Sequence, residues 1–259
     1  MVKLNSYIDR GKGFPILFVH AFPLNHKMWM PQMEYLQKFY RVIAFDMHGF
    51  GNAPSVDHPL SIEDYADEII DLLDHLGIEQ CIVAGLSLGG YIVFALLKKY
   101  PNRFRGAILA NTRAGADSDE AKNTRFAQAT EIRAIGMKTF IDTMVNRLVG
   151  EYSKQNRKPV QLSLRTIMEQ ALPEATARML EAMAARPDSL DALDNLSIPV
   201  CLVCGEEDTI TPVAEMERIH QKLSNAEFHV LPRCGHLTNM EDADAFNRII
   251  KEFSDRIVS

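Results

Sequence analysis

Long hydrophobic runs and an excess of positive charge are both missing from the sequence. No apolar stretch approaches the roughly 20 residues that a membrane-spanning helix requires, and the opening residues MVKLNSYIDRGKG have no signal-peptide core. Lys and Arg number 28 against 34 Asp and Glu, which leaves a formal net charge of -6. We therefore expect a cytoplasmic protein that binds neither membranes nor nucleic acid, since an anionic partner calls for a basic face.

Cysteine is also scarce, with four in 259 residues. Cys81, Cys201 and Cys204 lie in apolar runs, as small reduced core residues do. Cys201 and Cys204 have the spacing of a redox or zinc pair, but residues three apart on a strand point to opposite faces. No spacing of His, Asp and Glu indicates a metal site, and no G-x-G-x-x-G motif follows a strand. We expect neither a metal nor a cofactor.

Short apolar runs alternate with longer amphipathic segments along most of the chain. Because these runs are apolar throughout, they are typical of parallel strands that are covered on both faces. Between them, residues 61–76 have apolar side chains at helical spacing. The pattern predicts an α/β protein with a mostly parallel central sheet flanked by helices, and residues 2–9 are expected to add an edge strand. The predicted parallel strands are residues 15–20, 41–46, 80–85, 105–111, 199–205 and 226–232.

One segment, residues 112–187, breaks this alternation. It has no strand-like run, and candidate helices lie near 118–149, 153–171 and 173–185. Their apolar side chains exceed what a solvated excursion needs, so one face should pack on the rest of the protein. We expect a core domain made of residues 1–111 and 188–259, with residues 112–187 inserted as a helical cap over the carboxyl edge of the sheet.

A single serine is surrounded by glycines in the stretch VAGLSLGGY, residues 83–91. The stretch follows a predicted strand and precedes a predicted helix, so the G-x-S-x-G motif lies on a tight turn between them. In such a turn the serine is held in a strained backbone conformation, and Gly85 and Gly89 relieve the crowding between strand and helix. The motif therefore indicates that Ser87 is presented as a nucleophile.

A serine nucleophile needs a base and a carboxylate, which should follow it in the order Ser, acid, His. Asp208 in CLVCGEEDTITP and His236 in HVLPRCGHLTNMED each follow a predicted strand. Because reactive groups gather beyond the carboxyl ends of parallel strands, Ser87, Asp208 and His236 can converge. Glu206 and Glu207 remain alternatives to Asp208, since one residue of loop register is not visible in a sequence.

Other histidines compete for the role of base. His20 and His48 also follow predicted strands at the same edge, but both precede the serine in the chain. The remaining histidines are placed within a strand, on helix faces or in surface segments, where structural or solvated roles are more common: His229, His220, His75, His26 and His58.

An oxyanion requires two backbone donors near the nucleophile. Leu88 follows the serine at the start of the predicted helix, and the loop FVHAFPLNHKMW after the first central strand supplies Phe22. These residues complete a pattern that resembles the α/β-hydrolase fold. The resemblance covers PILFVHAFPLNHKMW, DMHGFGNAP, AGLSLGGY, GEEDTITP and GHLTNMED, and points to the capped branch with carboxylesterases, 3-oxoadipate enol-lactonases, cofactor-free haloperoxidases and carbon–carbon bond hydrolases.

By this resemblance Ser87 is the nucleophile, His236 the base, Asp208 the triad acid, and Phe22 and Leu88 the oxyanion donors. Two loops depart from the family pattern. His20-Ala21 stands where the family has His-Gly. The stretch DMHGFGNAP has His48 and Asn52 where the family has Arg and Ser. An Arg commonly braces neighbouring loops, so these departures bear on the loops behind the oxyanion site.

The expected activity is hydrolysis of carboxylic esters or lactones of small to medium apolar substrates through an acyl-enzyme. A ligand sensor with slow turnover, a carbon–carbon bond hydrolase and a perhydrolase remain alternatives that use the same residues. The expected partner is a small ester or lactone, and the sequence predicts no oligomeric state. Arg113 could meet an anionic substrate, although pairing with Asp117 or Asp119 is favoured. Apolar pocket candidates are Trp29, Leu86, Phe126, Phe140, Met144 and Leu148.

Overall fold

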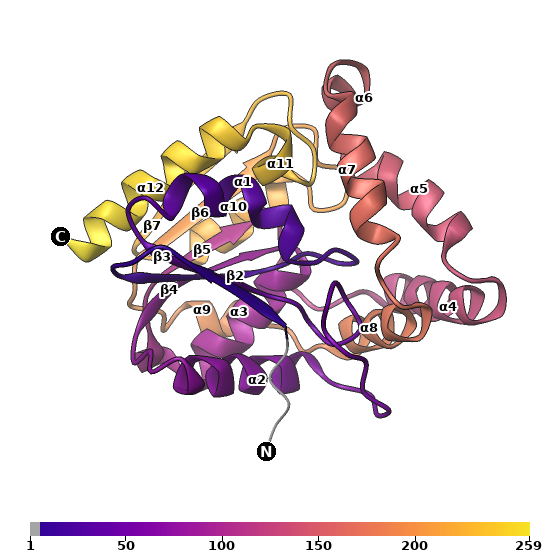
Figure 1. Cartoon of the computed structure of the whole chain (residues 1–259), viewed down its shortest axis with the longest axis horizontal. Coiled ribbons are helices and arrows are strands. Elements are labelled where there is room, and N and C mark those ends of the chain that lie inside the picture. Colours follow the sequence, from indigo (N-terminus) through magenta and orange to yellow (C-terminus); the bar gives the residue numbers. More distant parts are fainter. Residues whose placement is uncertain (1–5) are drawn as a thin grey trace.

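A seven-stranded sheet crosses the middle of the molecule in the computed structural model, which describes residues 6–259 (Figure 1). The strand order within these residues is β1-β3-β2-β4-β5-β6-β7. Neighbouring pairs from β3 to β7 are parallel, whereas β1 pairs with β3 antiparallel. The strands are β1 (Tyr7–Arg10), β2 (Pro15–Val19), β3 (Arg41–Phe45), β4 (Cys81–Leu86), β5 (Phe104–Ala110), β6 (Val200–Gly205) and β7 (Ala226–Leu231).

The predicted α/β architecture is confirmed, and each of the six predicted parallel strands is found within one or two residues of its expected position. The central strands β4 and β6 are buried along their whole length, which explains why they are apolar at every position. Of the predicted edge strand, residues 2–5 lie outside the described residues, and the part from Tyr7 onward forms β1.

Helices cover both faces of the sheet (Figure 1). On one face α1 (Met30–Leu36) packs on α12 (Ala243–Val258), and on the other α2 (Ile62–His75) packs on α3 (Leu88–Lys99). Helix α2 begins as its sequence predicts, because the Ser61 side chain accepts from the Asp64 N–H while the Asp64 carboxylate accepts from the Ser61 N–H. Further elements are α9 (Leu190–Leu193), α10 (Val213–Lys222), α11 (Thr238–Glu241), η1 (His26–Trp29) and η2 (Pro101–Arg103).

The inserted helices lie together at one side of the sheet in Figure 1, where α4 packs along α8. The predicted helix over 118–149 is wrong as a single element, because Gly136 with φ +80° separates α4 from α5. The predicted helix over 153–171 is likewise divided at Arg157, before Pro159, into α6 and α7. The inserted helices are α4 (Asp119–Ile135), α5 (Lys138–Leu148), α6 (Glu151–Asn156), α7 (Lys158–Met168) and α8 (Pro173–Ala185).

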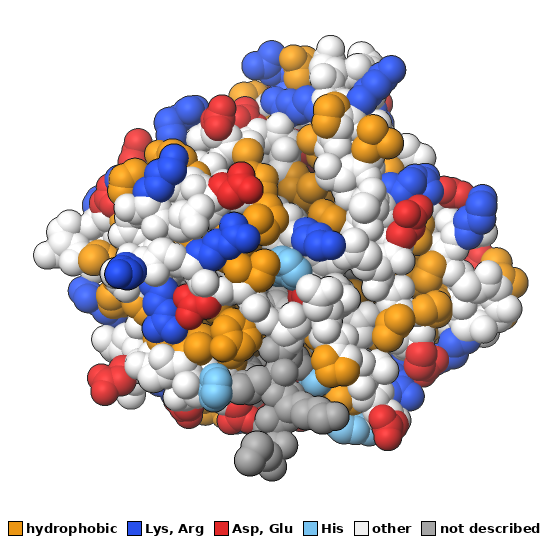
Figure 2. All heavy atoms as spheres, viewed as in Figure 1, with side chains coloured by type: hydrophobic (Ala, Val, Ile, Leu, Met, Phe, Trp, Pro, Cys, Tyr) orange, Lys and Arg blue, Asp and Glu red, His pale blue; other side chains and the backbone are white. Residues whose placement is uncertain are grey.

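Charged side chains of both signs are interspersed over the face shown in Figure 2, with no extended field of one sign. This view agrees with the nearly balanced counts of acidic and basic residues in the sequence. None of the helices within residues 6–259 combines the length and the apolar character needed to cross a membrane.

Candidate active site

Ser87 lies on the turn between β4 and α3, where the sequence predicts it. Its φ of 55° and ψ of -112° place it in a backbone region that a residue with a side chain rarely adopts. A Cβ on Gly85 would lie 2.4 Å from the Gly89 carbonyl oxygen, and one on Gly89 would lie 2.2 Å from that of Val19. Glycine at both positions therefore lets strand and helix approach, as predicted.

The Ser87 side chain is the accessible point of an otherwise buried segment. Residues 81–94 are all buried except Ser87, which is half-buried. The backbone around it is held in place, because its N–H donates to the Ala110 carbonyl (2.9 Å) and its carbonyl accepts from the Thr112 hydroxyl (2.8 Å). The turn thus presents one hydroxyl from a rigid support at the carboxyl edge of the sheet.

A buried imidazole and carboxylate meet beyond the ends of the next strands. His236 Nδ1 lies 2.8 Å from Asp208 Oδ2, and both residues are at least 95% buried, with relative exposures of 1% and 5%. Asp208 Oδ1 also accepts from the backbone N–H groups of Ile210 and Thr211. The carboxylate is therefore fixed in position and fixes the imidazole in turn.

The surroundings of Asp208 favour its ionised form. Burial alone would raise the pKa of this carboxyl, but the charge of His236 and hydrogen bonds from His236, Asn111 and Thr211 outweigh burial and lower the pKa to about 2. An ionised Asp208 accepts a hydrogen bond from His236 Nδ1–H. The Nε2 lone pair of His236 is then free to take a proton.

Asn111 connects the serine turn to this pair, and sequence reasoning missed it. Its Nδ2 donates to Asp208 Oδ2 (2.9 Å) and to the Gly235 carbonyl (3.1 Å), while its Oδ1 accepts from the Thr238 hydroxyl (2.7 Å). Register places it beside Ser87, because Leu86 pairs with Ala110 in the sheet. The available sequence signal was an asparagine at the end of a central strand, and its φ of +44° is a conformation that asparagine adopts more readily than most residues.

The serine hydroxyl itself is not yet joined to the pair. Within residues 6–259, no hydrogen bond links Ser87 Oγ to the His236 ring, whose polar neighbours are Asp208 and Thr211. Contacts of this kind are often long before substrate binds and shorten afterwards. The structure therefore brings Asp208 and His236 into contact, and it holds Ser87 at the same edge through Ala110 and Thr112, the two neighbours of Asn111 in the chain.

Two backbone donors are free beside the serine turn. Leu88 is the first residue of α3, so its N–H has no acceptor within the helix. Among the described residues, neither the N–H of Leu88 nor that of Phe22 donates a hydrogen bond to another part of the chain. These are the two groups that the sequence predicts as oxyanion donors.

The alternative acids have other roles. Glu207 Oε2 accepts from the Tyr152 N–H (3.0 Å), and Glu206 Oε2 accepts from the Arg233 N–H (3.3 Å). Within residues 6–259 neither carboxylate forms a hydrogen bond with the His236 ring, so Asp208 is the acidic partner of that imidazole.

A cavity of about 350 Å³ opens between the core and the inserted helices, and we name it the α4–α5 cavity. Phe22 contributes to its wall together with the predicted pocket residues Phe140 and Met144 of α5. Phe22 and Phe140 stack edge to face, with ring centroids 5.9 Å apart. The complete lining is Phe22, Tyr91, Arg113, Asp117, Ser118, Glu120, Ala121, Thr124, Arg125, Gln128, Phe140, Met144, Arg147, Leu180 and Ile210.

The other predicted pocket residues do not line this cavity. Trp29 is buried in the core, 4.9 Å from the Phe18 ring and 6.0 Å from the Phe246 ring. The Leu86 side chain is buried in β4, and Phe126 is 46% exposed on α4. The Leu148 side chain is also buried, and its carbonyl accepts from the His236 N–H (3.1 Å).

Arg113 does not pair with Asp117 or Asp119 as the sequence favours. Asp117 forms ion pairs with Arg125 (2.5 Å) and Arg186 (2.9 Å), whose guanidinium groups approach it from α4 and from the end of α8. Arg113 instead donates to the Ile210 carbonyl and lines the α4–α5 cavity. Its charge is therefore not neutralised by a carboxylate within the described chain.

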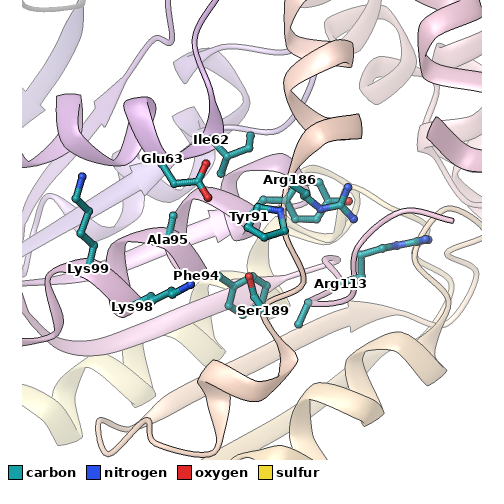
Figure 3. A pocket seen from close by; sticks show the side chains of 12 residues that line it. Ile62, Glu63, Tyr91, Phe94, Ala95, Lys98, Lys99, Arg113, Arg186 and Ser189 are labelled. Carbon is teal, nitrogen blue, oxygen red and sulfur yellow. The ribbon is translucent and has the colours of Figure 1, made fainter. Parts of the chain in front are cut away.

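A second cavity of about 300 Å³, the α2–α3 cavity, lies behind Tyr91 (Figure 3). Tyr91 and Arg113 line both cavities, so they belong to the wall between them. The Arg186 guanidinium lies 3.9 Å from the centre of the Tyr91 ring and stiffens this wall. Figure 3 shows the Arg113 side chain directed away from Lys98.

Residues 15–243 match the model of a family described as the alpha/beta hydrolase fold. The chain belongs to the alpha/beta hydrolase fold family. The match spans the serine turn, the strand ends that carry Asp208 and His236, and the inserted helices.

The relatives of this alpha/beta hydrolase include proteins whose descriptions name an activity. A thermophilic esterase from Thermogutta terrifontis, with malate bound, is 37% identical with a TM-score of 0.96, over 98% of this chain and 94% of that one. The enol-lactonase from Burkholderia xenovorans LB400 is 26% identical with a TM-score of 0.89, over 96% of each chain. 3-Oxoadipate enol-lactonase 2 from Acinetobacter baylyi is 29% identical over 241 residues, 93% of this chain and 88% of that protein.

One departure from the family pattern, His48, is accommodated by other contacts. In this alpha/beta hydrolase His48 Nε2 pairs with Glu68 (2.8 Å) and its Nδ1 donates to the Pro54 carbonyl (2.9 Å). Burial lowers the pKa of His48, but the contacts with Glu68 and Pro54 outweigh burial and raise it. His48 thus braces its loop against α2 through Glu68, in place of an arginine.

One group of potential metal ligands occurs within residues 6–259, and sequence spacing did not indicate it. Ligand atoms of Cys201, Glu227 and His229 lie within 4.8 Å of one another. The group fits a metal poorly, because Arg256 already pairs with Glu227 and burial raises the pKa of the Cys201 thiol well above its ordinary value. Cys201 and Cys204 are both free and buried.

Proposed function

We propose that the protein is a serine hydrolase that cleaves carboxylic esters or lactones through an acyl-enzyme. Ser87 Oγ attacks the substrate carbonyl while His236 Nε2 takes its proton. The N–H groups of Phe22 and Leu88 bind the resulting oxyanion, and Asp208 stabilises the imidazolium. His236 then gives the proton to the leaving alkoxide. A water molecule, deprotonated by His236, releases the acid and restores Ser87.

The contact between His236 and Asp208 carries this proposal most directly. A buried carboxylate kept ionised by its surroundings needs a charged or polar partner, and here that partner is an imidazole at the edge where Ser87 is presented. The named activities of the esterase and the enol-lactonases support the same reaction class. Residues 112–187 would then act as the cap that shapes the substrate pocket.

The cavity favours a substrate that carries a negative charge. Among the described residues Arg113 has no carboxylate partner, and neither does Arg147, which lines the same cavity. Apolar Phe140 and Met144 belong to the same lining. This combination suits an ester or lactone with a short apolar body and a carboxylate, in line with the 3-oxoadipate enol-lactonase and malate-bound esterase relatives.

Hydrolysis of p-nitrophenyl esters from acetate to octanoate tests the reaction. We expect steady multiple turnover by the parent protein and a loss of at least about 10⁴-fold in kcat for Ser87→Ala. The dependence of kcat/KM on the length of the acyl chain then reports the size of the substrate pocket. A single stoichiometric burst without turnover would instead favour a ligand sensor, and activity that survives in Ser87→Ala would overturn the acyl-enzyme proposal.

The charge preference has its own test. Arg113→Gln should raise KM for a p-nitrophenyl ester with a free carboxylate, such as the succinate monoester, by about 10- to 100-fold, since a charge-assisted hydrogen bond is lost. The uncharged butyrate ester, which lacks this contact, serves as the control and should change less than about threefold. Equal losses for both esters would contradict the proposed anion site.

A further inference from the structure

The Glu241 carboxylate joins two segments that are distant in sequence. It is buried, and it accepts hydrogen bonds at both oxygens. Oε2 accepts from the Gly150 N–H (2.9 Å), while Oε1 accepts from the N–H groups of Gly235 (2.9 Å) and Leu237 (3.1 Å). Three backbone donors on one buried carboxylate fix the positions of the segments that supply them.

These two segments touch directly beside the carboxylate. The His236 N–H donates to the Leu148 carbonyl (3.1 Å). Gly150 and Gly235 approach each other so closely that a Cβ on Gly150 would lie 2.8 Å from the Gly235 nitrogen. We name residues 148–150 the α5–α6 turn and residues 235–237 the base loop.

We propose that Glu241 is a positioning residue that fastens the α5–α6 turn to the base loop, so that the inserted helices fix the place of His236. This rests on the proposed role of His236 as the base. Because the turn follows α5, and α5 supplies Phe140 and Met144 to the cavity, the substrate wall and the base are held as one body. A shift of the turn would move His236 relative to Ser87.

The acceptor geometry requires a carboxylate rather than an amide. In Glu241→Gln one of the two oxygens becomes an NH₂ group, which faces an N–H in either orientation. The orientation that keeps two bonds leaves the amide oxygen on Gly235 and Leu237 and turns the NH₂ towards Gly150. Glu241→Gln should therefore release the α5–α6 turn while the base loop stays bonded.

Hydrogen exchange on the full-length protein, measured by NMR, tests this release. In Glu241→Gln we expect the Gly150 amide to exchange at least about tenfold faster, with Gly235 and Leu237 within about threefold of the parent. In ester hydrolysis, kcat is expressed per active site, with the active sites counted by organophosphate titration. We expect kcat of Glu241→Gln to be about 10- to 100-fold below that of the parent and KM to stay within about threefold. Misplacement of the base affects the chemical step rather than substrate binding.

Glu207→Gln is the matched control. Its carboxylate accepts from one N–H of the same region, that of Tyr152, so an amide can turn its oxygen to that donor. Exchange at Tyr152 and kcat should stay within about threefold of the parent. Comparable losses of kcat in both variants would contradict a specific role for Glu241.

Gly150→Ala tests the junction from the other side, and decides the question should Glu241→Gln fail to fold. Gly150 has φ -69°, which alanine adopts freely, so the added Cβ acts through its close approach to the Gly235 nitrogen of the base loop and to the Glu207 side chain. We expect the same loss of kcat per active site. Unchanged Gly150 exchange in Glu241→Gln, or parental kcat in Gly150→Ala, would overturn the proposal. The exchange result stands apart from the Ser87→Ala test, whose failure would overturn the proposed function instead.

Discussion

Two buried histidine–aspartate pairs lie on opposite sides of the strand that leads to Ser87. Asp208 follows β6 and meets His236, while Asp46 follows β3 and meets His26, each two strands from β4 in the sheet. The N–O distances are 2.8 Å in both pairs. Residue type, burial and sheet edge are therefore shared, and cannot by themselves identify a base.

The pairs differ in what surrounds the carboxylate. Asp46 accepts from the backbone N–H groups of His26 (2.7 Å) and Asn52 (3.0 Å), so it ties together two loops. Asp208 accepts from the Asn111 side chain, which lies beside the serine turn. We call them the bracing pair and the reaction pair. The comparison shows that the link to the nucleophile's strand, rather than the pair itself, distinguishes the proposed base.

Replacing the two histidines should give the largest difference in kcat between the two pairs. His236→Gln removes the proposed base and should lower kcat for ester hydrolysis by at least about 10⁴-fold. His26→Gln should leave kcat within about fivefold and lower stability by about 1–3 kcal/mol, because Asp46 loses a buried donor. Steady-state kinetics and urea unfolding measure the two effects, and equal losses of kcat would remove the distinction.

The matched substitutions Asp208→Asn and Asp46→Asn sharpen the comparison. In the first, the amide donates towards His236 Nδ1 and favours the wrong tautomer, so kcat should fall by about 10³- to 10⁴-fold. In the second, the amide opposes a backbone donor in either orientation, and stability rather than turnover should suffer. A large loss of kcat in Asp46→Asn, measured on folded protein, would show that the bracing pair takes part in the reaction.

Acid should weaken the reaction pair within a defined range of pH. The native pKa of Asp208 is about 2, below the value near 4 of an unfolded chain. Its contribution to stability is thus complete above pH 4 and lost as the pH falls towards 2, by about 2–3 kcal/mol. Urea unfolding of the parent at pH 5, 4 and 3 should show this decline, and Asp208→Asn should decline less. Equal declines would contradict the pKa difference.

Among the changes around the reaction pair, removing its connection to the serine strand should have the smallest effect on turnover. Asn111→Ala deletes one donor to Asp208 and the bond to the Gly235 carbonyl, and we expect kcat about tenfold lower. Thr112→Val, which deletes the hydroxyl that supports the Ser87 carbonyl, is the companion variant for the serine side of the link. An Asn111→Ala variant as active as the parent would show that Asp208 is held sufficiently by its backbone donors.

The sequence was sufficient for the fold and for the serine turn because both depend on local patterns. Uniformly apolar runs mark buried parallel strands, and glycines at 85 and 89 mark a place where backbones nearly touch. The loss of regular helix at Gly136 was missed because the apolar spacing continues across it. Local propensity does not register a single residue whose φ is positive.

Long-range polar contacts were the part that could not be predicted. The sequence places His26 in a surface segment, yet its side chain is buried. Asp46, 20 residues away in the chain, forms hydrogen bonds with both the His26 backbone N–H and the His26 ring. Asn111 and Glu241 likewise act on partners that come close only in the folded chain. His20 shows the same limit. Burial lowers its pKa to about 4, and Met47 N–H donates to its Nε2, which makes it a neutral brace.

Labelling with diethyl p-nitrophenyl phosphate, followed by peptide mass mapping, tests the central claim most directly. The reagent phosphorylates a serine that an adjacent base has activated, so it reports the nucleophile and the base together. We predict one diethylphosphoryl group per chain, located on Ser87, with labelling lost in His236→Gln and retained in His26→Gln. A label on another residue, or equal labelling of Ser87 in His236→Gln, would contradict the account.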